Sequence, residues 1–235
     1  MATFEIITQS ECSLSLKFGS SIDEEILTRL IAVHHEINKK PFPGFIESVP
    51  TYTSLTIYYD PVMVMRSTLA GHTPSEKVKA YFRKYEWKGF LKSSVEKIIP
   101  IPVCYDKSFG LDLEELATEL QLNIHDIVQL HSQKIYTVYM VGFTPGFPYM
   151  GTTHSKLSCS RKQTPRKQVA AGSVGMAGKQ TGIYPSATPG GWQIIGRTPI
   201  KLFSVDKNPP AFLQPGDKVK FNSISLEEFN SLNDL

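Results

Sequence analysis

The stretch "KIYTVYMVGF", Lys134–Phe143, decides the fold of the second half of the chain. It is rich in β-branched and aromatic residues and runs into a loop of glycines and prolines, which is typical of a strand. Four further strand-like pieces follow, separated by glycine and proline turns: "SVGMAG" (173–178), "WQIIG" (192–196), "IKLF" (200–203) and "KVKFNSIS" (218–225). Short strands in such a series predict a closed or nearly closed antiparallel barrel.

Another strand and two short helices precede this region. The stretch "VEKIIPIPVCY" (95–105) is strand-like, and apolar residues at helical spacing predict helices that begin at Asp112 and at Asn123. The composition changes at "WKGFLKSS" (87–94), where a glycine and two serines interrupt the pattern. We therefore expect a mainly-β barrel domain over residues 89–235.

The first half of the chain alternates strands with amphipathic helices in the order ββαββα. One helix is predicted within residues 21–40, where Ser21 and Glu24 have capping-box spacing, and a second begins at Thr73. This order suits a small α+β domain of the ferredoxin-like kind, with both helices on one face of the sheet. We expect that domain over residues 1–88.

Composition and charge exclude several classes of protein. With 41% hydrophobic and 20% charged residues among 235, the chain has an ordinary globular composition. Its net charge of +3 is spread along the sequence, so neither nucleic acid nor a membrane surface is expected as a partner. No signal pattern or membrane-length apolar run is visible, which predicts a cytoplasmic protein. The three cysteines lie far apart and outside any CxxC pair, so no disulfide and no metal is expected.

Two loops combine glycine and proline with large aromatic residues: "GFTPGFPYMG" (142–151) and "YPSATPGGWQIIGRTP" (184–199). Aromatic side chains stay out of water when something can cover them, so these loops are expected to be ordered. Some of their glycines need only serve turns, such as the type II pair Pro145-Gly146. We expect the following residues to form a pocket or a partner surface: Phe143, Pro145, Gly146, Phe147, Tyr149, Pro189, Gly190, Gly191 and Trp192.

The glycine-rich stretch "AGSVGMAGKQTG" (171–182) does not match a nucleotide-binding motif. A phosphate-binding loop ending in Gly178-Lys179 would need a glycine where Ser173 stands, and a serine or threonine where Gln180 stands. Any ATP that acts with this chain therefore needs a different cradle or another subunit.

Candidate polar residues lie around the same loops. Arg161, Arg166 and Arg197 carry planar guanidinium groups suited to a carboxylate or phosphate, and Thr181 offers a hydroxyl nearby. His131 lies on the apolar side of its predicted helix, either as a core histidine bonded to a backbone carbonyl or as a catalytic acid or base. No serine, histidine and aspartate set is legible, so nucleophilic catalysis by this chain alone is not expected.

Six segments carry a resemblance to a known family: "PFPGFIESVPTYTSLTIYYD" (41–60), "VCYDKSFGLDLEELA" (103–117), "GFTPGFPYMG", "TPRKQVAAGSVGMAGKQTGIYP" (164–185), "TPGGWQIIGRTP" (188–199) and "LQPGDKVKF" (213–221). They resemble the family that contains the PxpB subunit of 5-oxoprolinase, the kinase A inhibitor KipI and subunit 1 of allophanate hydrolase. The resemblance covers nearly the whole chain. It implies an N-terminal α+β domain followed by a cyclophilin-like β-barrel, without implying prolyl isomerase activity.

For function, the resemblance implies an ATP-dependent hydrolase that opens the lactam of 5-oxo-L-proline to L-glutamate. This chain would act together with 5-oxoprolinase subunits C and A, and it would need those partners for turnover. ATP is the expected cofactor, bound by a partner or shared with one. Under this hypothesis Arg161, Arg166, Arg197 and Thr181 hold a substrate carboxylate or phosphate.

The same resemblance implies a rival function. KipI-like members are inhibitors that bind a sporulation histidine kinase and block its autophosphorylation, and the aromatic loops would then be a docking surface. An enzyme subunit should give turnover of 5-oxoproline only with its partners, whereas an inhibitor should suppress a purified kinase alone. A third possibility, urea or allophanate metabolism, is less favoured because a biotin-dependent carboxylase is not part of this chain.

Overall fold

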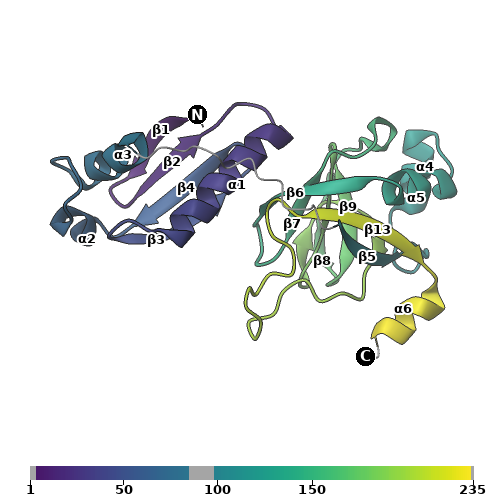
Figure 1. The fold of residues 1–235 in the computed structure, drawn as a ribbon. Coiled ribbons are helices and arrows are strands. Elements are labelled where there is room, and N and C mark those ends of the chain that lie inside the picture. The colour runs from purple at the N-terminus through teal and green to yellow at the C-terminus, as the bar shows by residue number, and fades with distance from the viewer. Residues whose placement is uncertain (1–3, 85–97, 234–235) are drawn as a thin grey trace. The chain divides into compact units, whose positions relative to one another are not determined.

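The computed structural model describes residues 4–84 and 98–233. The chain divides into two compact units, Met1–Ser94 and Val95–Leu235 (Figure 1). The domain boundary predicted between residues 88 and 89 lies outside the described residues, so its position stays a prediction. In the described part, no helix is both long enough and apolar enough to cross a membrane.

The first unit is one antiparallel sheet with helices. Its strands are β1 (Glu5–Ser10), β2 (Ser13–Lys17), β3 (Phe45–Pro50) and β4 (Ser54–Tyr59), in the order β1-β2-β4-β3. Its helices are α1 (Glu24–Lys39), α2 (Pro61–Arg66) and α3 (Pro74–Lys84). The predicted strands and both long helices are confirmed, whereas α2 was not predicted.

Helices α1 and α3 pack on the same face of this sheet. Leu30 of α1 and Phe82 of α3 belong to one buried cluster with Leu16 and Ile57 of the strands. In the described residues no strand of this sheet follows α3, so the element order differs from the β-α-β-β-α-β order of ferredoxin-like domains. The α+β sheet is therefore observed, and the ferredoxin-like assignment stays a prediction.

The cap of α1 was predicted wrongly. Asp23, not Ser21, caps the helix, because its carboxylate accepts the backbone N–H groups of Glu25 at 2.8 Å and Ile26 at 3.2 Å. Aspartate is as good a cap as serine, and here it stands directly before the first helical turn.

The second unit is a closed barrel with additional helices. Seven strands follow the order β10-β7-β6-β13-β5-β12-β9, and β9 pairs with β10 to close the barrel. They are β5 (Ile98–Cys104), β6 (Ile135–Val141), β7 (Pro148–Gly151), β9 (Ser173–Ala177), β10 (Gln180–Ile183), β12 (Gln193–Arg197) and β13 (Lys218–Ile224). The remaining elements are α4 (Leu113–Leu120), α5 (Ile124–Ser132), a 3-10 turn η1 (Ser155–Leu157), the ribbon β8 (Arg166–Val169) with β11 (Thr188–Gly190), and α6 (Leu226–Asn233).

The prediction that the barrel is antiparallel is wrong at one pair of strands. Strands β13 and β5 run parallel, with Lys218 opposite Ile98 and Ile224 opposite Cys104. Such a pair needs a long crossover, and here the chain between β5 and β13 contains both short helices and most of the barrel. The stretch "IKLF" is also no strand, since only an isolated bridge joins Phe203 to Ala211. The barrel is confirmed, and the cyclophilin-like assignment stays a prediction.

The barrel strands have two buried faces. Met176 and Ile195 belong to the large core inside the barrel, whereas their neighbours Ala177 and Ile194 belong to a second, smaller cluster. Successive side chains of a strand point to opposite faces, so this second cluster lies on the outside of the barrel. It includes the buried rings of Phe147, Tyr184 and Trp192, together with Val169 of the ribbon. This outer aromatic cluster forms the base of the candidate site.

Candidate functional site

A pocket of about 240 Å³ opens over the outer aromatic cluster. We call it the aromatic pocket, and its lining residues are Phe143, Phe147, Tyr149, Arg161, Pro165, Tyr184, Pro189, Gly190, Gly191 and Trp192. Seven of the nine residues expected from the two aromatic loops therefore line one pocket. The other two, Pro145 and Gly146, form the adjacent turn, where Gly146 has a φ of 86° and Phe147 N–H donates to Thr144 O at 3.0 Å.

The walls of the aromatic pocket are rings packed edge to face. The ring of Phe147 lies 5.2 Å from that of Tyr184 at 81°, and 5.4 Å from that of Trp192 at 84°. The ring of Tyr149 lies 5.8 Å from that of Trp192. Edge-to-face pairs are favourable beyond the area they bury, so these rings form rigid walls.

Phe143 stands at the mouth of the pocket in an unusual conformation. Its side chain is 65% exposed, and its φ of 70° lies in the left-handed region. A residue with a Cβ adopts that region only at an energetic cost, and such strain is often found at functional sites. The ring contacts Phe147 edge to face at 5.8 Å, so it extends the aromatic wall toward solvent.

Gly190 is required for space and not for a turn. Neither Gly190 nor Gly191 has a positive φ, so the expected turn conformation is wrong for both. A Cβ at Gly190 would collide with the hydroxyl and ring atoms of Tyr184. The missing side chain therefore lets the ring of Tyr184 pack directly under β11.

The three predicted arginines do not converge. Arg161 lines the pocket with its Cζ 6.0 Å from the centroid of the Trp192 ring, and it makes no ion pair within the described part of the chain. Arg166 Nη2 donates to Asp112 Oδ1 at 2.6 Å. Arg197 Nε donates to the carbonyl of Ala171 at 2.8 Å. Of the three, Arg161 alone presents its guanidinium to the pocket ready for an anionic group.

Two phenol groups complete the polar character of the pocket. Burial raises the pKa of Tyr184, and the hydrogen bond from the Trp192 backbone N–H and the nearby arginines offset only part of that rise. Burial likewise raises the pKa of Tyr149, and the positive charge of Arg161 opposes it. Both phenols therefore stay protonated at neutral pH and are hydrogen-bond donors. Tyr184 and Pro165 were not among the expected residues, although both stand within the quoted family motifs.

His131 and Thr181 lie together inside the barrel, away from the aromatic pocket. Thr181 Oγ1 donates to Gly175 O at 3.1 Å, so His131 Nε2 must donate to Thr181 at 2.9 Å. The other ring nitrogen, Nδ1, then accepts from the Tyr105 hydroxyl at 2.8 Å. Burial lowers the pKa of His131 to about 3, so the ring is neutral.

The partners of His131 are hydroxyl groups, so the backbone carbonyl expected as its partner is wrong. Neither His131 nor Thr181 lines the aromatic pocket, and both side chains are 0% exposed. This geometry favours a structural role for both residues, and neither enters the site proposed below.

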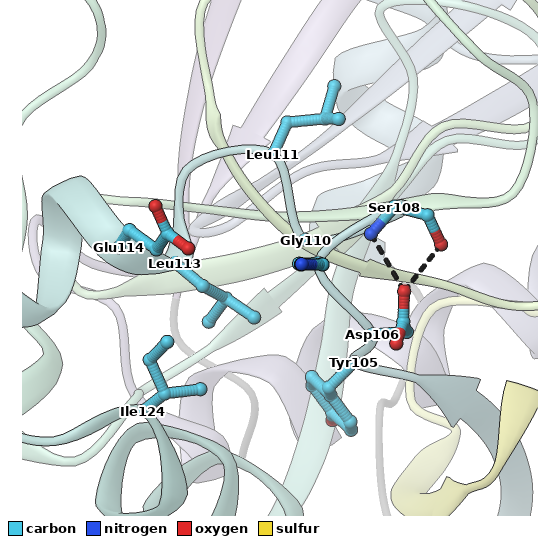
Figure 2. Close-up of a pocket in the computed structure, with 9 residues that line it drawn as sticks. Tyr105, Asp106, Ser108, Gly110, Leu111, Leu113, Glu114 and Ile124 are labelled. Carbon is cyan, nitrogen blue, oxygen red and sulfur yellow. Dashed lines mark hydrogen bonds between the residues drawn. The ribbon is translucent and has the colours of Figure 1, made fainter.

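A second pocket, of about 380 Å³, lies beside the start of α4. Figure 2 shows Tyr105, Leu113 and Ile124 around one side of it, with Asp106 and Ser108 on the other. The carboxylate of Asp106 already accepts the N–H of Ser108 at 2.9 Å and its hydroxyl at 2.6 Å. These bonds lower the pKa of Asp106. Its polar groups are thus satisfied within the loop, which favours the aromatic pocket as the functional site.

The described residues contain no group of three or more histidine, cysteine, aspartate or glutamate side chains placed to hold a metal ion. The glycine-rich stretch is a hairpin turn between β9 and β10, with Gly178 at a φ of 59°. No helix N-terminus follows it, so this turn is no phosphate cradle. The residues present do not fit ATP.

Comparison with known proteins gives three findings. A profile of the family described as "Carboxyltransferase domain, subdomain C and D" matches residues 4–213. The PxpB subunit of 5-oxoprolinase from Bacillus subtilis is 41% identical over 232 residues, covering 97% of this chain and 96% of that protein. The urea amidolyase of Kluyveromyces lactis is similar in structure, with a TM-score of 0.70 over 95% of this chain and 15% of that protein. At 18% identity that likeness shows the fold alone.

Proposed function

Since this chain belongs to the carboxyltransferase domain, subdomain C and D family, we propose that it is the PxpB subunit of an ATP-dependent 5-oxoprolinase. The complex would hydrolyse 5-oxo-L-proline to L-glutamate. The observation that carries the proposal is the aromatic pocket with the free guanidinium of Arg161, on a chain similar to a 5-oxoprolinase subunit along its whole length.

The shape and chemistry of the aromatic pocket suit this substrate. 5-Oxoproline is a small, flat lactam ring with one carboxylate. Ring walls from Phe147 and Trp192 take a flat apolar face, and a pocket of about 240 Å³ has room for one such molecule. The guanidinium of Arg161 supplies a two-point partner for the carboxylate.

The phenols of Tyr149 and Tyr184 supply neutral donors at the same pocket. Because burial keeps both protonated, they can donate to a carbonyl oxygen without adding charge. A lactam presents such an oxygen at the edge of its ring. In this proposal Arg161 binds the carboxylate, the aromatic rings orient the substrate and exclude water, and the phenols recognise the lactam.

We assign ATP to a partner subunit. The described residues form no cradle for it, and the nearest phosphate-loop candidate is a hairpin turn. The partner subunits would therefore supply the ATP site, while this chain supplies recognition of the lactam. A role of Arg166 or Arg197 in holding phosphate would require each to leave its present partner.

The experiment is a reconstitution of the enzyme from this chain and its two separately purified partner subunits. We expect ATP-dependent release of glutamate from 5-oxo-L-proline only when all three are present. Turnover by the two partners without this chain would contradict the proposal.

A kinase inhibitor remains the second candidate, because the exposed ring of Phe143 at the pocket mouth would also suit a docking surface. It is tested by adding the purified chain alone to a histidine kinase. Inhibition of autophosphorylation at a stoichiometric ratio would support this alternative.

A further inference from the structure

Asp112 stands directly before α4, where a helix cap is expected, but its carboxylate does not cap that helix. The side chain is 1% exposed and makes no hydrogen bond to the first turn of α4. An aspartate at this position normally accepts backbone N–H groups of that turn. A buried carboxylate is costly unless it is paired, so its partners lie elsewhere.

The carboxylate of Asp112 binds three groups from the walls of the aromatic pocket. Oδ2 accepts from the backbone N–H of Ile194 at 2.6 Å, and Oδ1 accepts from Arg166 Nη2 at 2.6 Å and Lys162 Nζ at 2.9 Å. The backbone N–H of Asp112 also donates to the carbonyl of Ile194 at 2.9 Å. One buried residue thus joins α4 to β12, to β8 and to the loop 160–165.

Lys162 links Asp112 to the loop that carries Arg161. Its backbone N–H donates to the carbonyl of Gly191 at 2.8 Å, and its ammonium group also contacts Glu115 on the exposed side of α4. Lys162 is therefore held at both its backbone and its charged end. This fixes the chain immediately next to Arg161.

The other two partners of Asp112 hold the opposite wall. Arg166 is the register partner of Gly190 in the β8–β11 ribbon. Ile194 lies two residues after Trp192 and shares the outer aromatic cluster with it. Every group bound by Asp112 is thus one or two residues, or one ladder step, from a residue that lines the pocket.

We propose that Asp112 is a positioning residue for the aromatic pocket, which sets where the guanidinium of Arg161 lies relative to the indole of Trp192. Asp112 does not itself line the pocket, so it acts through its neighbours. The effect on substrate binding rests on the proposed function, whereas the effect on the loop does not.

The charge of Asp112 is essential to this role. Burial raises the pKa of Asp112, but the hydrogen bonds from Arg166, the Ile194 backbone and Lys162 together lower it further, so the net pKa lies below its usual value. The carboxylate is therefore ionised at neutral pH. Asparagine would keep its shape and leave the positive charges of Arg166 and Lys162 without their counterion.

The test compares Asp112→Asn with Glu115→Gln, both in a Trp87→Phe background. The chain has two tryptophans, so this background leaves Trp192 as the single fluorophore. We expect Asp112→Asn to increase acrylamide quenching of Trp192 about twofold or more as the loop loosens. In the reconstituted enzyme it should raise KM for 5-oxoproline roughly tenfold with little change in kcat. Glu115→Gln, which removes only an exposed contact of Lys162, should change neither.

The two readouts separate this proposal from the proposed function. Increased quenching with an unchanged KM would confirm the positioning role and overturn substrate binding in this pocket. Unchanged quenching would overturn the positioning role, whatever the KM. Should Asp112→Asn fail to fold, Lys162→Met breaks one of the same contacts, and unchanged quenching in that variant overturns the proposal equally.

Discussion

The guanidinium of Arg161 lies over the indole of Trp192, with its Cζ 6.0 Å from the ring centroid. Trp192 is 5% exposed and belongs to the outer aromatic cluster, so the exposed arginine rests on a fixed ring. A cation held over an aromatic face keeps its donors free at the edge of the guanidinium. This pair therefore presents a positive group at the pocket without neutralising it.

Replacing Trp192 with phenylalanine should weaken substrate binding moderately. Phenylalanine keeps an apolar wall but is a poorer partner for a cation, at a loss of about 0.5–1 kcal/mol. We expect KM for 5-oxoproline to rise about two- to fivefold, measured in the reconstituted enzyme. Tyr149→Phe is the matched control for a change of lining without loss of the cation contact. An unchanged KM in Trp192→Phe would show that the indole does not help to hold Arg161.

Replacing Phe143 with glycine should stabilise the second unit relative to alanine at the same position. Glycine adopts a positive φ without the cost that a Cβ imposes, about 1 kcal/mol. Phe143→Ala removes the same ring but keeps the Cβ, so the difference between the two variants isolates the backbone. We expect Phe143→Gly to unfold at higher denaturant than Phe143→Ala. Equal midpoints would mean that the left-handed backbone at this position stores no strain.

Replacing Gly190 with alanine should destabilise the protein and disturb the pocket. The new Cβ would collide with the ring of Tyr184, and overpacking of this kind costs about 1–3 kcal/mol. Gly191→Ala is the neighbouring control, because its Cβ would meet the nearest atom, Pro165 Cγ, at 3.6 Å. Chemical denaturation of both variants measures the difference. Equal stability of the two would contradict the close packing of Tyr184 under β11.

His131 should make the protein less stable in mild acid. Its pKa is lowered to about 3 in the folded chain, from an ordinary value of 6.5, so the unfolded chain binds a proton first as the pH falls. The stabilising effect is complete above pH 6.5 and is lost as the pH falls toward 3. Between pH 6.5 and pH 5 the loss is about 2 kcal/mol.

The comparison uses His131→Gln, which keeps a neutral hydrogen-bonding side chain. We expect its free energy of unfolding to fall less than that of the natural chain over this range. His34, whose pKa burial and His35 lower to about 4, titrates in both proteins and cancels in the comparison. Identical pH dependence of the two proteins would show that His131 is not held neutral by the fold.

Local chemistry predicted the aromatic pocket well. Large rings beside glycines and prolines need cover, and Phe147 and Trp192 find it in each other. The partner of Arg166 could not be predicted, because Asp112 is 54 residues away in the sequence and stands where a helix cap is expected. The parallel pairing of β5 with β13 was hidden for a related reason, since a strand pattern encodes which side is buried but not which neighbour it meets.

The histidine was predicted in the core, but its partners were not. Position on the apolar side of α5 shows that His131 is buried, whereas the hydroxyl of Thr181 reaches it from β10, 50 residues later. Contacts of that kind depend on how the barrel closes.

The measurement that tests the account most directly is the KM of the reconstituted enzyme for 5-oxo-L-proline with Arg161→Met in place of the natural chain. Methionine keeps the length of the side chain but removes the charge-assisted bond to a carboxylate, worth about 1.5–3 kcal/mol. We predict a KM raised roughly ten- to a hundredfold with kcat nearly unchanged, and no such change for Lys167→Met on the exposed side of β8. A KM equal to that of the natural enzyme would show that the substrate carboxylate does not bind in the aromatic pocket.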